Sequence, residues 1–329
     1  MIRTTAYPRA ALIGNPSDGY YGKTIAFVFK NFSAQVELEE SAQLRIIPCQ
    51  RDRMEFNSAA ELAEEIREFG YYGGVRLVKA AIKAFYDYAA LKGHTLHSKN
   101  FTLRYSTDIP HRLGLAGSSA IVTAVMKSLM QFYSVDISKP LLANLILSVE
   151  KDELKIGAGL QDRVAQVYGQ PVYMDFDKVI MDSQGYGDYI PFSKELLPPV
   201  YLAYRENLSE GSEVTHNDLA VRYSKGDAAV LHAVEQWKAL TTAVWNKLQK
   251  GEKEIAELIN HNFDIRNATI KVSAGNKQLI EVARGAGVSA KFTGSGGAII
   301  GTYNNDEMYN RLVEEMKQIG AVVIKPDIA

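Results

Sequence analysis

The amino-acid sequence predicts an α+β protein built from two domains. Its 329 residues suit one large domain or two ordinary ones. Strands are followed by helices in the first half, and the second half has the order strand, helices, strand, strand, helix, strand, a decorated split βαβ arrangement. Glycines and prolines cluster at 185–199, so we predict a first domain at 1–185 and a second at 186–329.

Hydrophobic periodicity assigns the elements of the first half. Compact apolar runs, or apolar residues that alternate with polar ones, predict strands at 25–29, 34–38 and 101–105. Apolar spacings of three and four predict helices at 58–70, 75–89, 114–133 and 138–154. A capping-box pattern opens the first helix at Ser58, Gly70 closes it, and Pro140 lies in the first turn of the last helix.

The second half shows the same kinds of pattern. The elements expected there are a strand at 200–204, helices at 227–249 and 252–271, strands at 288–292 and 298–303, and a closing helix and strand. A glycine cluster separates the two neighbouring strands. The sequence has no internal repeat, heptad array or low-complexity tract.

Composition disfavours several classes of protein. Lysine and arginine total 37 against 38 aspartates and glutamates, a net charge of −1, so no sequence-wide positive field attracts nucleic acid or anionic lipid. The apolar run 141–149 is interrupted by Asn144 and is far shorter than the roughly 20 residues of a membrane helix. With no apolar signal core and Cys49 as the only cysteine, we expect a cytoplasmic protein.

The segment 109–120, which runs from a strand end into an apolar helix, is the strongest functional signal. Glycines let a backbone bend around an anion, and the amide hydrogens and dipole of a helix start attract it. Phosphate is the anion we expect, and serine hydroxyls can add hydrogen bonds or reach a metal ion that bridges phosphates. The nucleotide-binding residues expected there are Gly114, Leu115, Ala116, Gly117, Ser118 and Ser119. A loop of small residues with a serine cap is the competing interpretation.

Two further segments contain glycine-rich turns. The segment 291–297 connects two predicted strands, and it is either an ordinary hairpin loop or a second loop that closes over the same phosphates. The segment 8–23 is a short buried strand followed by a turn that offers Asn15 and Asp18 to a hydroxylated ligand. A plain Asn-Pro, Asp-Gly turn is the alternative for the second segment.

Glu150 and Asp162 lie twelve residues apart across a Gly-Ala-Gly break. Such a break lets carboxylates on two helices converge on one site, where a metal ligand and a base for a hydroxyl nucleophile are needed. Charged residues on helices are more often solvated, so the spacing alone leaves both interpretations open.

The joint order of these segments resembles the GHMP kinases, the family of galactokinase, homoserine kinase, mevalonate kinase and phosphomevalonate kinase. The family's opening motif is similar to 8–14, its phosphate loop to 110–120 and its closing motif to 291–297. The resemblance implies an N-terminal ribosomal-protein-S5-like mixed α/β domain and a C-terminal ferredoxin-like domain, with the active site in the cleft between them. It also implies ATP and Mg²⁺ as cofactors.

Within the family, the segments 14–24, 159–169 and 291–297 look most like the branch that phosphorylates the anomeric hydroxyl of glucuronic acid. Galactokinases carry Gly-Glu-His in place of Gly14-Asn15-Pro16, and commonly Asp-Gln in place of Asp162-Arg163. Both departures argue against galactose as the acceptor. Many relatives have glycine where this chain has Ala116, which keeps the residue small.

Position in the motifs also implies roles for single residues. The loop from Gly114 to Ser119 holds the triphosphate, Ser119 and Glu150 hold Mg²⁺, and Asp162 orients or deprotonates the attacking hydroxyl. Arg9 lowers the pKa of that aspartate and helps neutralise the transferring phosphoryl group. The substrate-binding residues expected are Asn15, Asp18, Lys23, Arg163, Gly294, Ser295 and Gly296.

A sugar acid requires a cationic or amide partner, because an unpaired carboxylate in a cleft is unfavourable. Lys23 and Arg163 are the candidates, with Lys23 placed first. Two other classes of function stay open: a kinase for another sugar or small alcohol, and a sensor that binds ATP and sugar without turnover. The sequence does not predict the oligomeric state.

Overall fold

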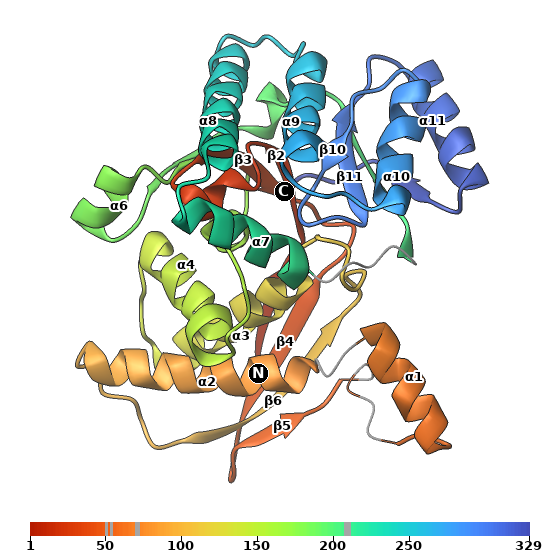
Figure 1. Ribbon diagram of the computed structural model, residues 1–329. Coiled ribbons are helices and arrows are strands. Elements are labelled where there is room, and N and C mark those ends of the chain that lie inside the picture. The colour runs from red at the N-terminus through yellow and green to blue at the C-terminus, as the bar shows by residue number, and fades with distance from the viewer. Residues whose placement is uncertain (50–51, 53–54, 70–72, 207–211) are drawn as a thin grey trace.

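The computed structural model describes residues 1–49, 52, 55–69, 73–206 and 212–329. Over these residues the chain forms three four-stranded sheets, one of which lies in the C-terminal half. In Figure 1 the first part of the chain, coloured red to green, forms the lower body, and the last part, coloured cyan to blue, covers it from above. The opening strands, in red, also reach up beneath these late helices.

The first sheet packs one face on the core. Its strands in spatial order are β1 (Ile2–Ala6), β4 (Ala34–Ser41), β6 (Asn100–Thr107) and β5 (Arg45–Ile47). β5 runs parallel to β6, and the other pairs are antiparallel. Val36, Leu38 and Leu103 are buried at alternate positions, which confirms the strands predicted at 34–38 and 101–105.

The second sheet is antiparallel and carries the predicted opening segment. It contains β2 (Arg9–Ile13), β3 (Lys23–Val28), β7 (Val172–Asp175) and β8 (Asp188–Pro191). A short 3₁₀ turn, η1 (Ser17–Tyr20), lies between β2 and β3. β8 pairs with β7 although it lies beyond residue 185, and the division of the chain at that residue stays a prediction.

Six helices accompany these sheets in the described part of the first 185 residues. They are α1 (Ala59–Phe69), α2 (Gly74–Leu91), α3 (Gly117–Tyr133), α4 (Lys139–Ser148), α5 (Leu160–Tyr168) and α6 (Lys178–Gln184). Ser58 Oγ accepts a hydrogen bond from the Glu61 amide at 3.1 Å, as the capping-box pattern predicts, while Gly70 lies outside the described residues. α4 ends earlier than expected and continues as a π-helical turn, η2 (Val149–Glu153).

The C-terminal half has the ferredoxin-like order of strands. Its antiparallel sheet contains β10 (Lys291–Phe292), β11 (Ala298–Thr302), β9 (Val200–Tyr204) and β12 (Val322–Ile324), in that spatial order. Its helices are α7 (Ser212–Ser224), α8 (Ala228–Gln249), α9 (Ala256–Thr269), α10 (Ala274–Gly285) and α11 (Asp306–Gln318). The strand expected at 288–292 is shorter, because Ser289 exchanges hydrogen bonds with Thr302 ahead of β10.

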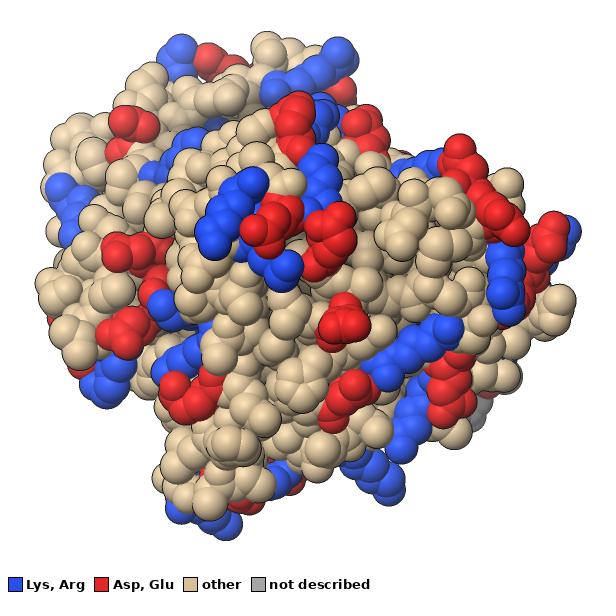
Figure 2. Space-filling model, turned by 90° about the horizontal axis from the view of Figure 1, so that it is seen from above, with Lys and Arg blue, Asp and Glu red and all other residues tan. Residues whose placement is uncertain are grey.

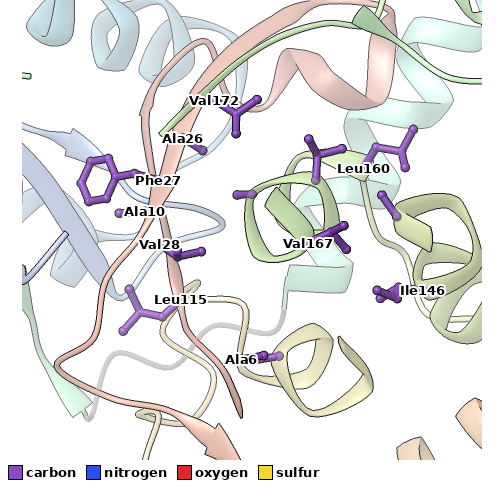
Figure 3. Close-up of a cluster of buried hydrophobic side chains, with 14 of the residues drawn as sticks. Ala6, Ala10, Ala26, Phe27, Val28, Leu115, Ile146, Leu160, Val167 and Val172 are labelled. Atoms are coloured by element: carbon purple, nitrogen blue, oxygen red, sulfur yellow. The ribbon is translucent and has the colours of Figure 1, made fainter. Parts of the chain in front are cut away.

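Apolar side chains anchor the two segments that carry most of the predicted site. Leu115, in the phosphate loop, is 2% exposed, and Leu160, at the start of α5, is 8% exposed. Figure 3 shows Leu115 beside the strand that bears Val28, and Leu160 on the same helix as Val167. Burying a leucine stabilises a fold by about 1.5–3 kcal/mol, so these anchors fix the loop and the helix to the core.

Candidate active site

The loop from Gly114 to Ala116 turns in the left-handed region just before α3. Gly114 has φ of 64° and Ala116 has φ of 63°. Glycine adopts this conformation freely, whereas a residue with a Cβ pays roughly 1–2 kcal/mol. The left-handed turn at Ala116 is a conformation that favours glycine, so this alanine carries a conformational cost.

Every carbonyl of this loop is held by the protein. Arg9 Nη1 donates to the Gly114 carbonyl at 2.9 Å, the Arg9 amide donates to the Leu115 carbonyl at 3.1 Å, and Gln166 Nε2 donates to the Ala116 carbonyl at 2.9 Å. A trans peptide directs its N–H away from its C=O. In the part of the chain that the structure describes, no amide of 115–119 donates a hydrogen bond. A row of free amides at a helix start suits a phosphate group.

Arg9 joins the distant segments of the site. Its Nε donates to Asp162 Oδ1 at 2.6 Å, and its Nη2 lies 2.6 Å from the same oxygen. Its Nη1 also donates to the Thr293 carbonyl at 2.6 Å, as well as to Gly114. One guanidinium therefore connects the opening strand, the phosphate loop, the closing loop and the proposed base.

Asp162 lies in the first turn of α5 and keeps 19% of its side chain exposed, so a substrate can reach its carboxylate. Burial by itself raises the pKa of Asp162, but the charges of Arg9 and Arg163 and hydrogen bonds from Arg9 and Gln161 outweigh it and lower that pKa. The carboxylate is ionised at neutral pH and can accept a hydrogen bond from a hydroxyl group.

Asp18, in the turn η1, approaches the same helix. Its Oδ2 accepts a hydrogen bond from the Gln161 amide at 3.4 Å, and a Cβ at Gly159 would collide with this oxygen. Burial and the negative charge of Asp162 raise the pKa of Asp18 to about 6, although Arg9 opposes the shift. The structure thus places two carboxylates of different acidity at the start of α5.

Glu150 lies in the π-helical turn that follows α4, and it is almost fully buried. Its Oε1 accepts a hydrogen bond from Ser118 Oγ at 2.6 Å, and its Oε2 pairs with the Arg163 guanidinium, which also lies 3.4 Å from Asp162. Ser119 is turned inward and donates to the Ala116 carbonyl at 3.1 Å. The structure brings Ser118, rather than Ser119, to Glu150.

The closing loop packs directly on the phosphate loop. A Cβ at Gly294 would overlap the Gly114 carbonyl, so only glycine permits this approach. Asn15 Nδ2 donates to the Gly294 carbonyl at 3.4 Å, and the Gly296 backbone has φ of 152°. Ser295 packs closely against Gly114, since a Cβ added at Gly114 would lie 2.9 Å from the Ser295 amide nitrogen. The predicted turn, phosphate loop and closing loop therefore meet.

Lys23 and Arg163, the cations proposed for the sugar acid, occupy different surroundings. Lys23 Nζ pairs with Asp175 Oδ2 at 2.7 Å, and its side chain remains 27% exposed. The Arg163 side chain is only 3% exposed and is enclosed by Glu150 and Asp162. Arg163 therefore lies among the proposed catalytic carboxylates, and Lys23 lies on the neighbouring sheet.

Sequence reasoning missed several buried polar residues that support these loops. Arg266 donates to the Gly294 carbonyl at 2.9 Å and to the Ser295 carbonyl at 2.7 Å. Asn262, one helical turn earlier on α9, accepts from the Gly14 amide at 2.7 Å. Lys291 Nζ donates to two carbonyls, those of Ala11 at 2.6 Å and Phe292 at 2.8 Å. The sequence offered one signal for two of them: Asn262 and Arg266 are polar residues four positions apart on an otherwise apolar, buried face of α9.

The face of the molecule seen from above has, over its described residues, no patch in which one sign of charge dominates. Lysine and arginine side chains are interspersed with aspartate and glutamate over the described part of that face (Figure 2). No helix among the described residues is long and apolar enough to cross a membrane.

An ionised aspartate held by arginine beside a row of free amides fits a phosphotransferase that acts on a hydroxyl group. Comparison with known proteins agrees. The model of the GHMP kinase N-terminal domain matches residues 76–170. Over 98% of this chain and 89% of the relative, the sequence is 42% identical to "Probable glucuronokinase 2" of Arabidopsis thaliana. It is 41% identical to "Glucuronokinase 1" of the same plant, over 99% of this chain and 91% of the relative.

The chain belongs to the GHMP kinase family, so the predicted family is confirmed. The fold agrees as well: phosphomevalonate kinase of Streptococcus pneumoniae, in complex with phosphomevalonate and AMPPNP, has a TM-score of 0.76. That comparison covers all of both chains at 14% identity. The predicted two-part α+β fold of this family is therefore confirmed.

Proposed function

We propose that this protein transfers the γ-phosphoryl group of ATP to the anomeric hydroxyl of D-glucuronic acid, giving glucuronate 1-phosphate and ADP. One observation carries the proposal: a chain that is similar along nearly its whole length to two glucuronokinases places an ionised aspartate beside a phosphate-binding loop. The aspartate and loop support the chemistry, and the similarity supports the choice of acceptor.

The chemistry follows from the geometry around Asp162. Its carboxylate accepts a hydrogen bond from the anomeric hydroxyl and so orients the oxygen toward phosphorus. As the new O–P bond forms and the bond to the bridging oxygen of ADP breaks, the hydroxyl proton passes to Asp162. Because Arg9 keeps the pKa of Asp162 low, the proton transfers late, once the hydroxyl has become acidic through bonding to phosphorus.

The phosphate loop binds the triphosphate. Free amides at 115–119 and the positive end of the α3 dipole face the phosphates, and Ser118 adds a hydroxyl group. The closing loop at Gly294, Ser295 and Gly296 lies against this loop and completes the site on the other side. Positioning and charge neutralisation supply most of the catalysis of phosphoryl transfer.

The residues present fit a magnesium ion. Glu150 and Ser118 offer a carboxylate and a hydroxyl oxygen 2.6 Å apart, and Mg²⁺ takes oxygen ligands, few of them from the protein. Bound magnesium neutralises charge on the phosphate oxygens. Glu150 and Ser118 are the ligands favoured by this geometry, since Ser119, the serine expected from the motif, is already engaged by Ala116.

The uronate carboxylate is assigned to Lys23 in this proposal. Lys23 is the partly exposed cation of the two candidates, and it can exchange Asp175 for a substrate carboxylate. Arg163 is only 3% exposed and pairs with Glu150 and Asp162, so its role in this proposal is to hold the two carboxylates in place. A cytoplasmic location, expected from the sequence, is part of the same proposal.

A coupled assay of ADP release tests the function. The purified protein is given ATP and Mg²⁺ with a panel of uronic acids, neutral sugars, mevalonate and homoserine. We expect turnover with D-glucuronate well above that with D-glucose. Turnover with a neutral sugar alone would keep the kinase and refute the acceptor, and binding of ATP and sugar without any ADP release would favour a sensor.

A further inference from the structure

Two buried amide oxygens beside the proposed substrate site have no hydrogen-bond partner. Among the described residues, the buried side-chain acceptors in this state are Asn15 Oδ1 and Gln161 Oε1. Asn15 is 3% exposed and Gln161 is 2% exposed. Buried polar atoms in folded proteins are nearly always paired, so an unpaired acceptor needs a ligand or a bound water. Asn15 belongs to the expected substrate-binding residues, whereas Gln161 has no assigned role.

Gln161 is placed where a substrate must bind. It occupies the first turn of α5, directly before Asp162, and its backbone amide donates to Asp18 Oδ2 at 3.4 Å. Its side chain hydrogen-bonds to the Asp162 carboxylate. The nitrogen and oxygen of the Gln161 side-chain amide are bonded to the same carbon atom. Oε1 therefore lies close to the Asp162 carboxylate, which in the proposed function faces the acceptor hydroxyl.

We propose that Gln161 binds the acceptor sugar: Oε1 accepts a hydrogen bond from a hydroxyl of the sugar, while the amide hydrogens hold Asp162. This inference rests on the proposed function, since it takes the acceptor to be a hydroxylated sugar acid. An amide oxygen only accepts hydrogen bonds. It therefore pairs with a hydroxyl group and cannot pair with an ionised carboxylate, so Gln161 fixes the sugar ring and leaves the acid group to a cation.

A second glutamine on the same helix provides a matched control. Gln166 is also 2% exposed, but both ends of its amide are engaged. Its Oε1 accepts from Thr123 Oγ1 at 3.3 Å, and its Nε2 donates to the Ala116 carbonyl at 2.9 Å. The two residues differ in whether the amide oxygen is already satisfied by the protein. Replacing Gln166 removes only protein hydrogen bonds. Replacing Gln161 removes its hydrogen bond to Asp162 and, in addition, an acceptor that only a ligand completes.

The experiment compares Gln161→Leu and Gln166→Leu with D-glucuronate and with its 2-, 3- and 4-deoxy analogues at saturating ATP. We expect Gln161→Leu to lower kcat/KM for glucuronate roughly 10- to 100-fold, the scale of one lost hydrogen bond at a buried group. On the one analogue that lacks the partner hydroxyl, Gln161→Leu should lose a clearly smaller factor than on glucuronate, because only its effect on Asp162 remains. Gln166→Leu should lower kcat/KM by one common factor on all four sugars.

The outcomes separate the readings. If Gln161→Leu loses the same factor on every deoxy analogue as on glucuronate, Oε1 binds a buried water or nothing, and the inference is overturned. Gln161→Met, which keeps the length of the side chain, gives the same comparison if the leucine variant does not fold. Should the wild type phosphorylate no uronate, the proposed function fails instead, and deoxy forms of the sugar that it does accept decide the role of Gln161.

Discussion

Replacing Asp18 with asparagine should stabilise the protein against unfolding while impairing catalysis. Burial raises the pKa of Asp18, the charge of Asp162 raises it further, and Arg9 only partly opposes them, so the pKa is about 6 against an ordinary 3.8. An ionised Asp18 is therefore disfavoured in the folded protein relative to the unfolded chain. Ionised Asp18 therefore lowers the free energy of unfolding by about 3 kcal/mol at pH 7.5, and the neutral side chain of asparagine removes this penalty.

The penalty that Asp18 imposes on the free energy of unfolding depends on pH. Below the unfolded pKa the carboxyl group is protonated in both states, so it carries no penalty. As pH rises through the folded pKa, the stability associated with the protonated Asp18 is lost. The gain from Asp18→Asn should be about 1 kcal/mol at pH 4.5 and about 3 kcal/mol at pH 7.5. Urea unfolding at both pH values, with wild type as reference, measures the gain from the shift in midpoint.

Asp162→Asn is the matched control, because the linkage has the opposite sign. Burial raises the pKa of Asp162, but Arg9 and Arg163 lower it below its ordinary value, so ionised Asp162 stabilises the fold at neutral pH. Its replacement should destabilise the protein, and the difference should vanish as pH falls through the folded pKa. Turnover should fall on the order of 10²-fold or more, while ATP still binds.

Two results would refute this reasoning. One is a loss of stability for Asp18→Asn at pH 7.5. The other is a gain of equal size at both pH values, which would mean that the effect comes from packing rather than from ionisation. A stabilised but slow variant is the expected outcome, because functional sites keep groups that the fold alone disfavours.

Further substitutions test the metal ligands and the carboxylate partner. Ser118→Ala and Glu150→Gln should weaken the Mg²⁺ dependence of ATP binding, whereas Ser119→Ala should leave it nearly unchanged; a magnesium titration that ranks the two serine variants the other way would contradict the assignment. Lys23→Ala should reduce kcat/KM for glucuronate at least about 10-fold more than for glucose, because only the acid is left unpaired. Arg163→Ala should impair both sugars alike, since it leaves Glu150 buried without its counter-ion; equal losses from Lys23→Ala would remove Lys23 as the carboxylate partner.

Local patterns predicted most elements because their signals are local. The capping box at Ser58 and the apolar stripe of α2 depend on neighbours three or four residues away, and the structure confirms both. α10 has no counterpart among the elements predicted from the sequence. Its buried face includes Asn276, which holds the Gly297 amide at 2.8 Å, so a polar residue serves where the helix pattern expects an apolar one.

The choice between the two serines illustrates what the sequence leaves undetermined. The glycine and serine run predicts a helix start within 114–119, and α3 begins at Gly117. Successive residues of a helix are rotated by about 100°, so the starting residue decides which side chain faces the cleft. With this start, Ser118 meets Glu150 and Ser119 points inward. The glycine motif locates the loop, but the contact that selects the serine comes from a residue 32 positions away.

Buried basic side chains hold the backbone of the loops that form the proposed phosphate site. Arg9, Arg266 and Lys291 all donate to carbonyl groups of the opening strand, the phosphate loop or the closing loop. A carbonyl held inward directs the N–H of its own peptide outward. Burial lowers the pKa of Lys291 well below its ordinary value, and its Nζ donates hydrogen bonds to the Ala11 and Phe292 carbonyls. These side chains therefore orient the amides of the proposed nucleotide site without any ligand, which is the preorganisation that electrostatic catalysis requires.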